Sequence, residues 1–496
     1  MKDSKFQVAI YDFITKESGN LVVDAVAGSG KTTTILNCLK RTPEKASKIF
    51  VAFNNAIVDE LKERISGIDS KATVSTMHSI CWRALMKHYK YQVKLNPNKS
   101  IKHIEKECKK LELPPKKVGF MMFTVSRLLD LIRQNLVDIN DYDSIDKLSI
   151  RFDLEFDEQI FGICKNVYTL MNKSKKEFDF TDMIFRVILD EIDMPKFDFV
   201  FVDESQDLST LQHMIIKKLI ANKGRLIAVG DPRQAIYGFA GADSDSYDNL
   251  KNLLPNTSEL PLSVNYRCSQ SVVRHAQSIN PNILPFKKNK EGEVNEDAIC
   301  SNIVSGDWVL CRNVKPLIVM NLYFLMRGVK SFVKGKDIGK GLEIFIKKMH
   351  SSTLDGLLKK IDLSVETEAN KLRKKGVRNP FNTEKIDRMV QRNDAIKLLS
   401  QNVHGVDSLL KYIRSVFKEE GEGVCLSTIH KSKGLENKNV FLLCPELIPS
   451  KYATQEWQLV QEENLKYVAI TRAKENFSYI TDYEKIEKQI AKKLKE

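Results

Sequence analysis

The sequence contains no two cysteines at the C-x-x-C spacing, although it has nine cysteines in all. Zinc ribbons and iron–sulfur clusters depend on such closely spaced pairs, so neither kind of metal site is indicated. No apolar stretch approaches the length of about 18 uncharged residues that a membrane-spanning helix requires, and residues 1–16 lack the apolar core of a signal peptide. We therefore expect reduced, scattered thiols in an intracellular protein that crosses no membrane, cytoplasmic or, in a eukaryote, nuclear.

Acidic residues are outnumbered by basic ones, with 64 Asp and Glu against 78 Lys and Arg, which gives a formal net charge of +14. A basic balance favours a polyanionic partner, although many basic chains have no such partner. No internal repeat or low-complexity segment is present. At 496 residues the chain is too long for one compact core, and the usual size of domains suggests about three or four units.

Short apolar runs bounded by polar or glycine-rich turns recur along the chain. They are LVVDAV at 21, KIFVAF at 48, FDFVFVDE at 197, RLIAVGD at 225, DWVLC at 307 and NVFLLC at 439. Such runs are typical of strands buried on both faces, as in a parallel sheet covered by helices, so the sequence predicts an α/β fold. Two stretches, at about 86–175 and 340–415, have helical spacing and little that resembles a strand. We interpret both as helical insertions into α/β domains.

A small-residue turn, AVAGSGKT at 25–32, follows the first apolar run. Backbone amides in such a turn can converge on phosphate oxygens at a helix N-terminus, while Lys31 neutralises the β and γ phosphates and the Thr32 hydroxyl binds Mg²⁺. The first position is Ala25 where the strict phosphate-loop pattern has glycine, so a plain strand-to-helix turn remains the alternative for this motif alone. The predicted nucleotide contacts of the turn are Ala27, Gly28, Ser29, Gly30, Lys31, Thr32 and Thr33.

Paired carboxylates end a second apolar run in FVFVDESQD at 199–207. Asp203 is placed to hold a metal ion, and Glu204 to orient or deprotonate a water molecule. Two acidic residues after a strand are usually a solvated turn, whereas the same pair together with a phosphate loop usually marks a nucleotide hydrolase. The sequence therefore predicts ATP and Mg²⁺ as cofactors.

Together with seven further segments, these two motifs resemble the UvrD/Rep/PcrA branch of superfamily 1 DNA helicases. KFQVAIYDFI, which contains Gln7, is similar to the family's Q motif. The other matching segments are VAFNNAIVDELKERI (51–65), STMHSICWRAL (75–85), VGDPRQAIYGFAGA (229–242), LSVNYRC (262–268), LSTIHKSKGLE (426–436) and ENLKYVAITRAK (463–474). They occur in the family's order through nearly the whole chain, which makes coincidence improbable.

The resemblance implies roles for residues that surround the nucleotide. Arg267 and Arg472 are expected to act as arginine fingers from a second domain, and Gln234 to sense the γ-phosphate. Tyr266 is expected to stack on the adenine, Glu436 to bond the ribose, and Gln7 to contact the adenine edge. With Lys31 and Glu204, the two arginines and Gln234 complete the predicted catalytic set.

Single-stranded DNA requires aromatic faces for stacking and cations or amides for its phosphates. By resemblance, the candidate DNA contacts are Phe53, Asn54, His78, Tyr237, Phe239 and His430. Taken singly, Phe53 or Phe239 would more often be a core side chain than a stacking platform, but their place within the motifs favours stacking. Ala240 stands where many relatives have arginine, which puts a polar contact at that position in doubt.

The resemblance also implies two RecA-like domains with one helical insertion each. The predicted ranges are 1–85 with 175–260 for the first domain, 86–174 for its insertion, 261–338 with 416–496 for the second domain, and 339–415 for a short second insertion. The chain ends soon after the last motif, so no nuclease-like domain is expected.

The predicted function is an ATP-dependent helicase that moves on single-stranded DNA, 3′ to 5′, and unwinds duplex at single-strand/duplex junctions. Replication or repair proteins are its expected partners. Two alternatives remain: a translocase that displaces proteins with little unwinding, and a DNA-bound interaction subunit that ATP merely switches. The complete set of Lys31, Glu204, Arg267 and Arg472 argues against the second. RNA remains open as a track because the motifs mainly address bases and phosphates.

Overall fold

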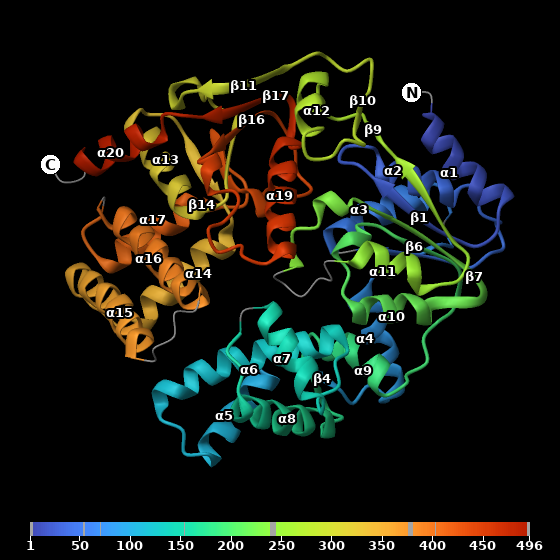
Figure 1. Ribbon diagram of the computed structural model, residues 1–496, viewed down its shortest axis with the longest axis horizontal. Helices are drawn as coiled ribbons and strands as arrows, with labels where there is room; N and C mark the ends of the chain where they lie inside the picture. The colour runs from blue at the N-terminus through green and yellow to red at the C-terminus, as the bar shows by residue number, and fades with distance from the viewer. Residues whose placement is uncertain are drawn as a thin grey trace. The chain divides into compact units, whose positions relative to one another are not determined.

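The computed structural model describes residues 3–493 except 53, 54, 70, 153, 239–244, 375–379 and 402. The chain divides into two compact units, Met1–Val264 and Asn265–Glu496 (Figure 1). Among the helices of the described ranges, none combines the length and the apolar character needed to span a bilayer.

The first unit is built on a six-stranded sheet whose neighbouring strands all run parallel, in the order β3-β2-β6-β7-β1-β8. Its strands are β1 (Asn20–Ala25), β2 (Lys48–Ala52), β3 (Thr73–Thr76), β6 (Phe197–Val202), β7 (Ile220–Gly230) and β8 (Thr257–Leu262). Val22 faces one hydrophobic core, whereas Leu21 and Val23 face the other. Because both faces are buried, residues 21–23 of β1 are consecutively apolar rather than alternating with polar residues.

Helices cover both faces of this sheet (Figure 1). Residues of α1 (Lys5–Lys16), α2 (Lys31–Leu39) and α3 (Asn55–Ser66) form one core with it. Residues of α4 (Met77–His88), α9 (Asp182–Leu189), α10 (Thr210–Leu219) and α11 (Ser246–Leu253) form the other. Between α4 and α9 the chain forms α5 (Lys99–Lys110), α6 (Pro115–Asn135), α7 (Tyr142–Arg151) and α8 (Glu158–Lys173), which have a core of their own, and the short strands β4 (Lys94–Leu95) and β5 (Glu177–Phe178).

The second unit contains a seven-stranded parallel sheet in the order β11-β17-β16-β12-β15-β13-β14. Its strands are β11 (Glu293–Ala298), β12 (Trp308–Cys311), β13 (Ser331–Lys334), β14 (Phe417–Lys418), β15 (Val424–Thr428), β16 (Asn437–Leu443) and β17 (Ala473–Ile480). The helices outside its insertion are α12 (Gln270–Ala276), α13 (Val314–Met326), α18 (Ile429–Ser432), α19 (Glu456–Ile470) and α20 (Tyr483–Lys493). A separate ribbon pairs β9 (Val264–Asn265) with β10 (Leu284–Pro285).

A run of four helices separates β13 from β14 in the sequence: α14 (Lys336–Lys348), α15 (Leu354–Lys374), α16 (Pro380–Ser400) and α17 (Val406–Val416). The two strands that flank this run are neighbours in the sheet, with Val333 opposite Phe417. The helical insertion therefore leaves and re-enters the unit at one edge of its sheet. These arrangements confirm the predicted fold class, two RecA-like α/β domains that each have a mainly helical insertion.

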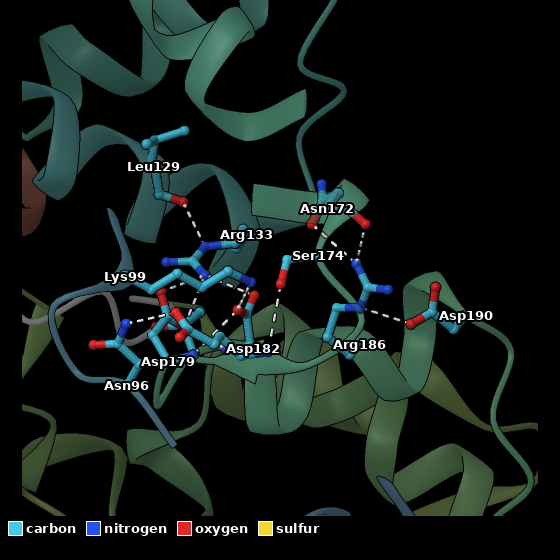
Figure 2. A network of polar contacts seen from close by, with 12 residues as sticks. Asn96, Lys99, Leu129, Arg133, Asn172, Ser174, Asp179, Asp182, Arg186 and Asp190 are labelled. Atoms are coloured by element: carbon cyan, nitrogen blue, oxygen red, sulfur yellow. Dashed lines mark hydrogen bonds and ion pairs between the residues drawn. The ribbon is translucent and has the colours of Figure 1, made fainter. Parts of the chain in front are cut away.

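A buried cluster of charged side chains joins the insertion of the first unit to α9 (Figure 2). Lys99 of α5 binds Asp182 at 2.6 Å, and Arg133 of α6 contacts Asp179 at 2.9 Å and Asp182 at 3.0 Å. A second guanidinium nitrogen of Arg133 binds Asp130 at 2.6 Å. The side chains of Lys99, Arg133 and Asp182 are at most 2% exposed. Charges this deeply buried are tolerated only in pairs, so the cluster fixes three helices relative to one another.

Arg186 of α9 extends the connection to the end of α8 (Figure 2). Its Nη1 donates to the main-chain oxygen of Asn172 at 3.0 Å, and its Nε donates to Asp190 at 2.6 Å. The first and the last helix of the insertion are thus both bonded to α9.

Substitution of Arg133 by methionine should lower the free energy of unfolding by about 3–5 kcal/mol, because it leaves buried carboxylates without their main cation. Chemical denaturation followed by circular dichroism measures this loss. Arg274→Met is the control, since the Arg274–Glu291 pair is half exposed and such pairs contribute little. Equal midpoints for the two variants would show that the buried cluster adds no stability.

Candidate active site

The phosphate loop connects the end of β1 to the start of α2. Gly28 and Gly30 have φ values of 64° and 80°, in the left-handed region, and Gly30 is the N-cap of α2. A Cβ on Gly30 would meet nothing within 4 Å, so the backbone conformation rather than crowding favours glycine there. The Ser29 hydroxyl is buried and has no hydrogen-bond partner among the described residues. This loop presents main-chain N–H groups at a helix N-terminus, the arrangement that binds phosphate.

Four of the predicted site residues meet although they come from two different strand ends. The hydroxyl of Thr32 donates to Oδ2 of Asp203 at 3.0 Å, and Nζ of Lys31 lies 3.9 Å from Oε2 of Glu204. Glu204 has a φ of 52°, which is rare for a residue other than glycine and is frequent at functional sites. The structure thus brings together the lysine, the hydroxyl and the acidic pair that the sequence predicts.

The chemistry of this group suits a divalent cation. Burial, together with the neighbouring Glu204 carboxylate, raises the pKa of Asp203 to about 6 against the opposing effect of Lys31. A bound cation would stabilise the ionised form of such a carboxylate. The hydroxyl of Thr32 and the carboxylate of Asp203 are hard oxygen donors, which Mg²⁺ prefers, so these residues fit the expected metal.

Gln206 and Asp231, which were not among the predicted site residues, link Glu204 to Gln234. The side-chain amide of Gln206 donates to Oε2 of Glu204 at 2.6 Å, and its oxygen accepts the main-chain N–H of Asp231 at 3.0 Å. Gln234 in turn donates to Oδ2 of Asp231 at 2.6 Å. Burial raises the pKa of Asp231 to about 6. Both residues stand inside quoted motifs, DESQD and VGDPRQ, so a search for polar side chains that could bridge the motifs would have found them.

Gln7 lies beside the start of α2, with its side chain bonded within the protein. Its oxygen accepts the N–H of Ser4 at 2.9 Å in a capping box, and its amide nitrogen donates to the hydroxyl of Thr34 at 3.2 Å. Thr33 is exposed, and its hydroxyl accepts from Arg64 at 3.4 Å. The expected contacts of Gln7 and Thr33 with nucleotide stay predictions.

The second unit places Arg267 and Glu436 together. Nε of Arg267 lies 2.5 Å from Glu436, and Lys474 binds the other oxygen of the same carboxylate at 2.7 Å. Burial raises the pKa of Glu436, but Lys474 and Arg267 outweigh this effect and hold it below its usual range. The ring of Tyr266 packs on Phe286 with centroids 4.8 Å apart. Arg267 and Lys474 therefore share the partly buried carboxylate of Glu436.

Arg472 is 1% exposed, a placement that the sequence did not predict. Its Nε donates to the carbonyl of Val468 at 3.1 Å and its Nη1 donates to the carbonyl of Leu435 at 2.9 Å. These bonds fix the guanidinium between α19 and the segment after α18. The expected role of Arg472 at the γ-phosphate stays a prediction.

Three of the six candidate DNA contacts lie within the described residues: His78, Tyr237 and His430. Phe53, Asn54 and Phe239 lie outside the described residues. Tyr237 is partly exposed, between η2 (Pro232–Gln234) and the start of α11. His78 lies in the first turn of α4, where burial lowers its pKa.

His430 belongs to α18 of the second unit. Burial, and then the nearby Arg312 guanidinium, lower its pKa to about 4. Arg312 is itself bonded to both oxygens of Glu462, at 2.7 and 2.6 Å. His430 is therefore neutral at neutral pH, so any contact with a phosphate would be a hydrogen bond rather than an ion pair.

Comparisons with known proteins agree with this geometry. The UvrD/REP helicase N-terminal domain matches residues 8–255, and the UvrD-like helicase C-terminal domain matches residues 341–484. The ATP-dependent DNA helicase PcrA of Bacillus subtilis is 26% identical over 313 residues, which cover 58% of this chain and 41% of PcrA. The ATP-dependent DNA helicase UvrD1 of Mycobacterium leprae is 25% identical over 300 residues, 54% of this chain and 38% of UvrD1.

A eukaryotic relative matches along more of the chain. The F-box DNA helicase protein 1 of Schizosaccharomyces pombe is 25% identical over 507 residues, which cover 92% of this chain and 54% of that protein. The chain thus spans between 38% and 54% of the length of these three relatives. With both family domains matched in order along the chain, the chain belongs to the UvrD/Rep helicase family.

Proposed function

We propose that this chain is an ATP-dependent motor that translocates on single-stranded DNA, 3′ to 5′, and separates the duplex ahead of it. The observation that supports this best is the assembly of Lys31 and Thr32 with Asp203 and Glu204 in a chain of this family. The names of its relatives, which are ATP-dependent DNA helicases, agree with it. The polarity follows from the family resemblance alone.

Within this proposal, each residue of the phosphate loop and the acidic pair has one task. The loop amides and Lys31 bind the phosphates, and Thr32 and Asp203 hold Mg²⁺, which when bound would neutralise phosphate charge. Glu204 orients the attacking water or accepts its proton. The 3.9 Å separation of Lys31 from Glu204 supports their action on one phosphate group.

The remaining nucleotide contacts are proposed from the resemblance. Arg267 and Arg472 would supply positive charge to the transferring phosphate, and Gln234 would sense the γ-phosphate. Tyr266, Glu436 and Gln7 would contact the adenosine. The salt bridge between Arg267 and Glu436 supports a shared task for these two residues.

We also propose the domain boundaries and the DNA contacts. The boundaries are 1–85 with 175–260 and insertion 86–174 for the first domain, and 261–338 with 416–496 and insertion 339–415 for the second. The proposed contacts with single-stranded DNA are Phe53, Asn54, His78, Tyr237, Phe239 and His430. The net charge of +14 supports a polyanionic track of this kind.

Unwinding of four matched substrates tests the proposal: a 3′-tailed duplex, a 5′-tailed duplex, a duplex with an RNA 3′ tail, and a blunt duplex. We expect ATP-dependent strand separation of the 3′-tailed DNA and little of the 5′-tailed or blunt duplex. Displacement of streptavidin from a biotinylated single strand, run beside it, detects translocation without unwinding.

Any other pattern of activity among these substrates would contradict one part of the proposal. Preference for the 5′ tail would reverse the polarity, and preference for the RNA tail would change the track. Streptavidin displacement without strand separation would indicate a translocase that clears proteins. ATP-dependent DNA binding with neither activity would indicate an ATP-switched interaction subunit.

A further inference from the structure

Helix α13 of the second unit is apolar on every side. In its sequence, VKPLIVMNLYFLM, the consecutive residues Leu317, Ile318, Val319 and Met320 are each at most 1% exposed. Successive residues of an α-helix point in directions about 100° apart, so these side chains face all around the helix axis. A helix of this kind requires apolar cover on all sides and belongs in the interior of a domain.

The cover of α13 comes partly from the sheet and partly from the helical insertion. The helix contacts β12, β13 and β15 on the one hand, and α16 of the insertion and the last helix, α20, on the other. Buried residues of the strands, of α13 and of all four insertion helices form one continuous hydrophobic core. Among its members are Ile346 of α14, Ile361 of α15, Ile396 of α16 and Ile413 of α17.

The insertion of the first unit is built differently. Its helices α5 to α8 have a core of their own, distinct from the two cores of the sheet beside it. A helical insertion with its own core keeps that core when it moves. The buried side chains of the second insertion instead complete the core of the sheet, so a movement away from α13 would expose both surfaces to water.

The first helix of the second insertion also lies directly against the domain. A Cβ on Gly339 of α14 would be 2.7 Å from the Cβ of Phe417 in β14, so only glycine allows this approach. In the same helix, Asp337 binds Lys431 of α18 at 2.7 Å. The insertion is thus held at its start as well as along α16.

Lys315, in the first turn of α13, contacts two further helices. Its Nζ lies 3.5 Å from Oδ2 of Asp394 in α16 and 3.3 Å from Oε1 of Glu487 in α20. The three side chains are between 31% and 38% exposed, so the pairs add little stability. They show that α13, α16 and α20 are neighbours at the surface of the unit as well as in its core.

We propose that the second insertion and the second RecA-like domain move as one body throughout the ATP cycle, because their separation would open the core around α13. Any movement that nucleotide imposes on the domain that contains Arg267 and Arg472 then carries α14 to α17 with it. The inference goes beyond the proposed function, and its consequence for movement rests on that function.

Single-molecule energy transfer between two dyes tests the proposal. The nine native cysteines are buried, so maleimide dyes should label introduced cysteines. Lys330→Cys, next to β13, and Lys359→Cys, in α15, replace side chains that are at least 75% exposed. We expect one transfer efficiency for this pair in the free protein, on oligo-dT, and on oligo-dT with AMP-PNP and Mg²⁺.

A second pair is the control for movement between the two units. It combines Lys330→Cys with Lys16→Cys, whose native side chain in α1 is 67% exposed. The proposed function requires the efficiency of this pair to change when AMP-PNP binds. The control therefore shows that the protein responds while the first pair stays constant.

A cross-link tests the same inference through activity. Bismaleimidoethane joins Lys315→Cys to Asp394→Cys and so ties α13 to α16. DNA-stimulated ATP hydrolysis and unwinding of the 3′-tailed duplex should be unchanged by this link. The single variant Asp394→Cys, treated with the same reagent, accounts for the effect of modification alone.

The outcomes separate this inference from the proposed function. Two efficiencies for the Lys330–Lys359 pair, or a shift with nucleotide or DNA, would overturn the inference and leave the proposed function intact. Loss of unwinding in the cross-linked protein, with the single variant still active, would do the same. A control pair that ignores AMP-PNP would contradict the proposed motor, whereas a constant first pair in the same preparation would still support a single body.

Discussion

Glu204→Gln should lower DNA-stimulated ATP hydrolysis by about 10²- to 10⁴-fold, the usual contribution of a general base, and leave ATP binding intact. The glutamine matches the carboxylate in size but cannot accept a proton from water. Lys31, 3.9 Å away, is unchanged and still binds phosphate. Phosphate release in the presence of oligo-dT measures turnover, and the fluorescence of a labelled ATP measures binding.

Lys31→Ala is the complementary variant, because it should lose both hydrolysis and nucleotide affinity. It removes the cation that the phosphates require, whereas Glu204 acts only after the nucleotide is bound. Normal turnover by Glu204→Gln would contradict its assignment as the base, and unchanged affinity of Lys31→Ala would contradict the phosphate loop.

The central strands of both units could be predicted from the sequence because they are buried on both faces. The run FDFVFVDE becomes β6 and ends at Val202, directly before the acidic pair. Edge strands could not be found in this way. β8 has the sequence TSELPL and lies half exposed at the margin of the sheet, so the usual apolar signal is absent.

The meeting of Lys31, Thr32, Asp203 and Glu204 could be predicted because parallel strands place their carboxyl ends at one edge of a sheet. The bonds of Gln206 and the burial of Arg472 could not, since each depends on the direction of a side chain after packing. The cluster around Arg133 was missed for another reason. Its partner Asp182 is 49 residues away in the sequence, and helical spacing describes only neighbours on one helix.

Arg472→Ala should reduce ATP hydrolysis by about 10³-fold or more and leave nucleotide binding largely intact, because an arginine finger acts mainly on charge that develops in the transition state. The structure adds a second expected effect. Truncation would remove this donor from the carbonyls of Val468 and Leu435. The Val468 oxygen would keep its bond from the hydroxyl of Thr471 at 3.2 Å, so the cost, about 1–3 kcal/mol, falls mainly on the carbonyl of Leu435. Turnover must therefore be measured per folded molecule, with thermal melting on the same sample.

Arg267→Ala separates these two effects. The side chain of Arg267 is 23% exposed, and Lys474 also binds its partner carboxylate. Removal of the Arg267 side chain should therefore cost less stability than removal of the Arg472 side chain. If both arginines serve the transferring phosphate, both variants lose turnover although their melting temperatures differ. If instead Arg472→Ala melts early while its folded fraction hydrolyses ATP at the normal rate, Arg472 stabilises the junction of α19 with the segment after α18, and Arg267 alone remains as a candidate finger.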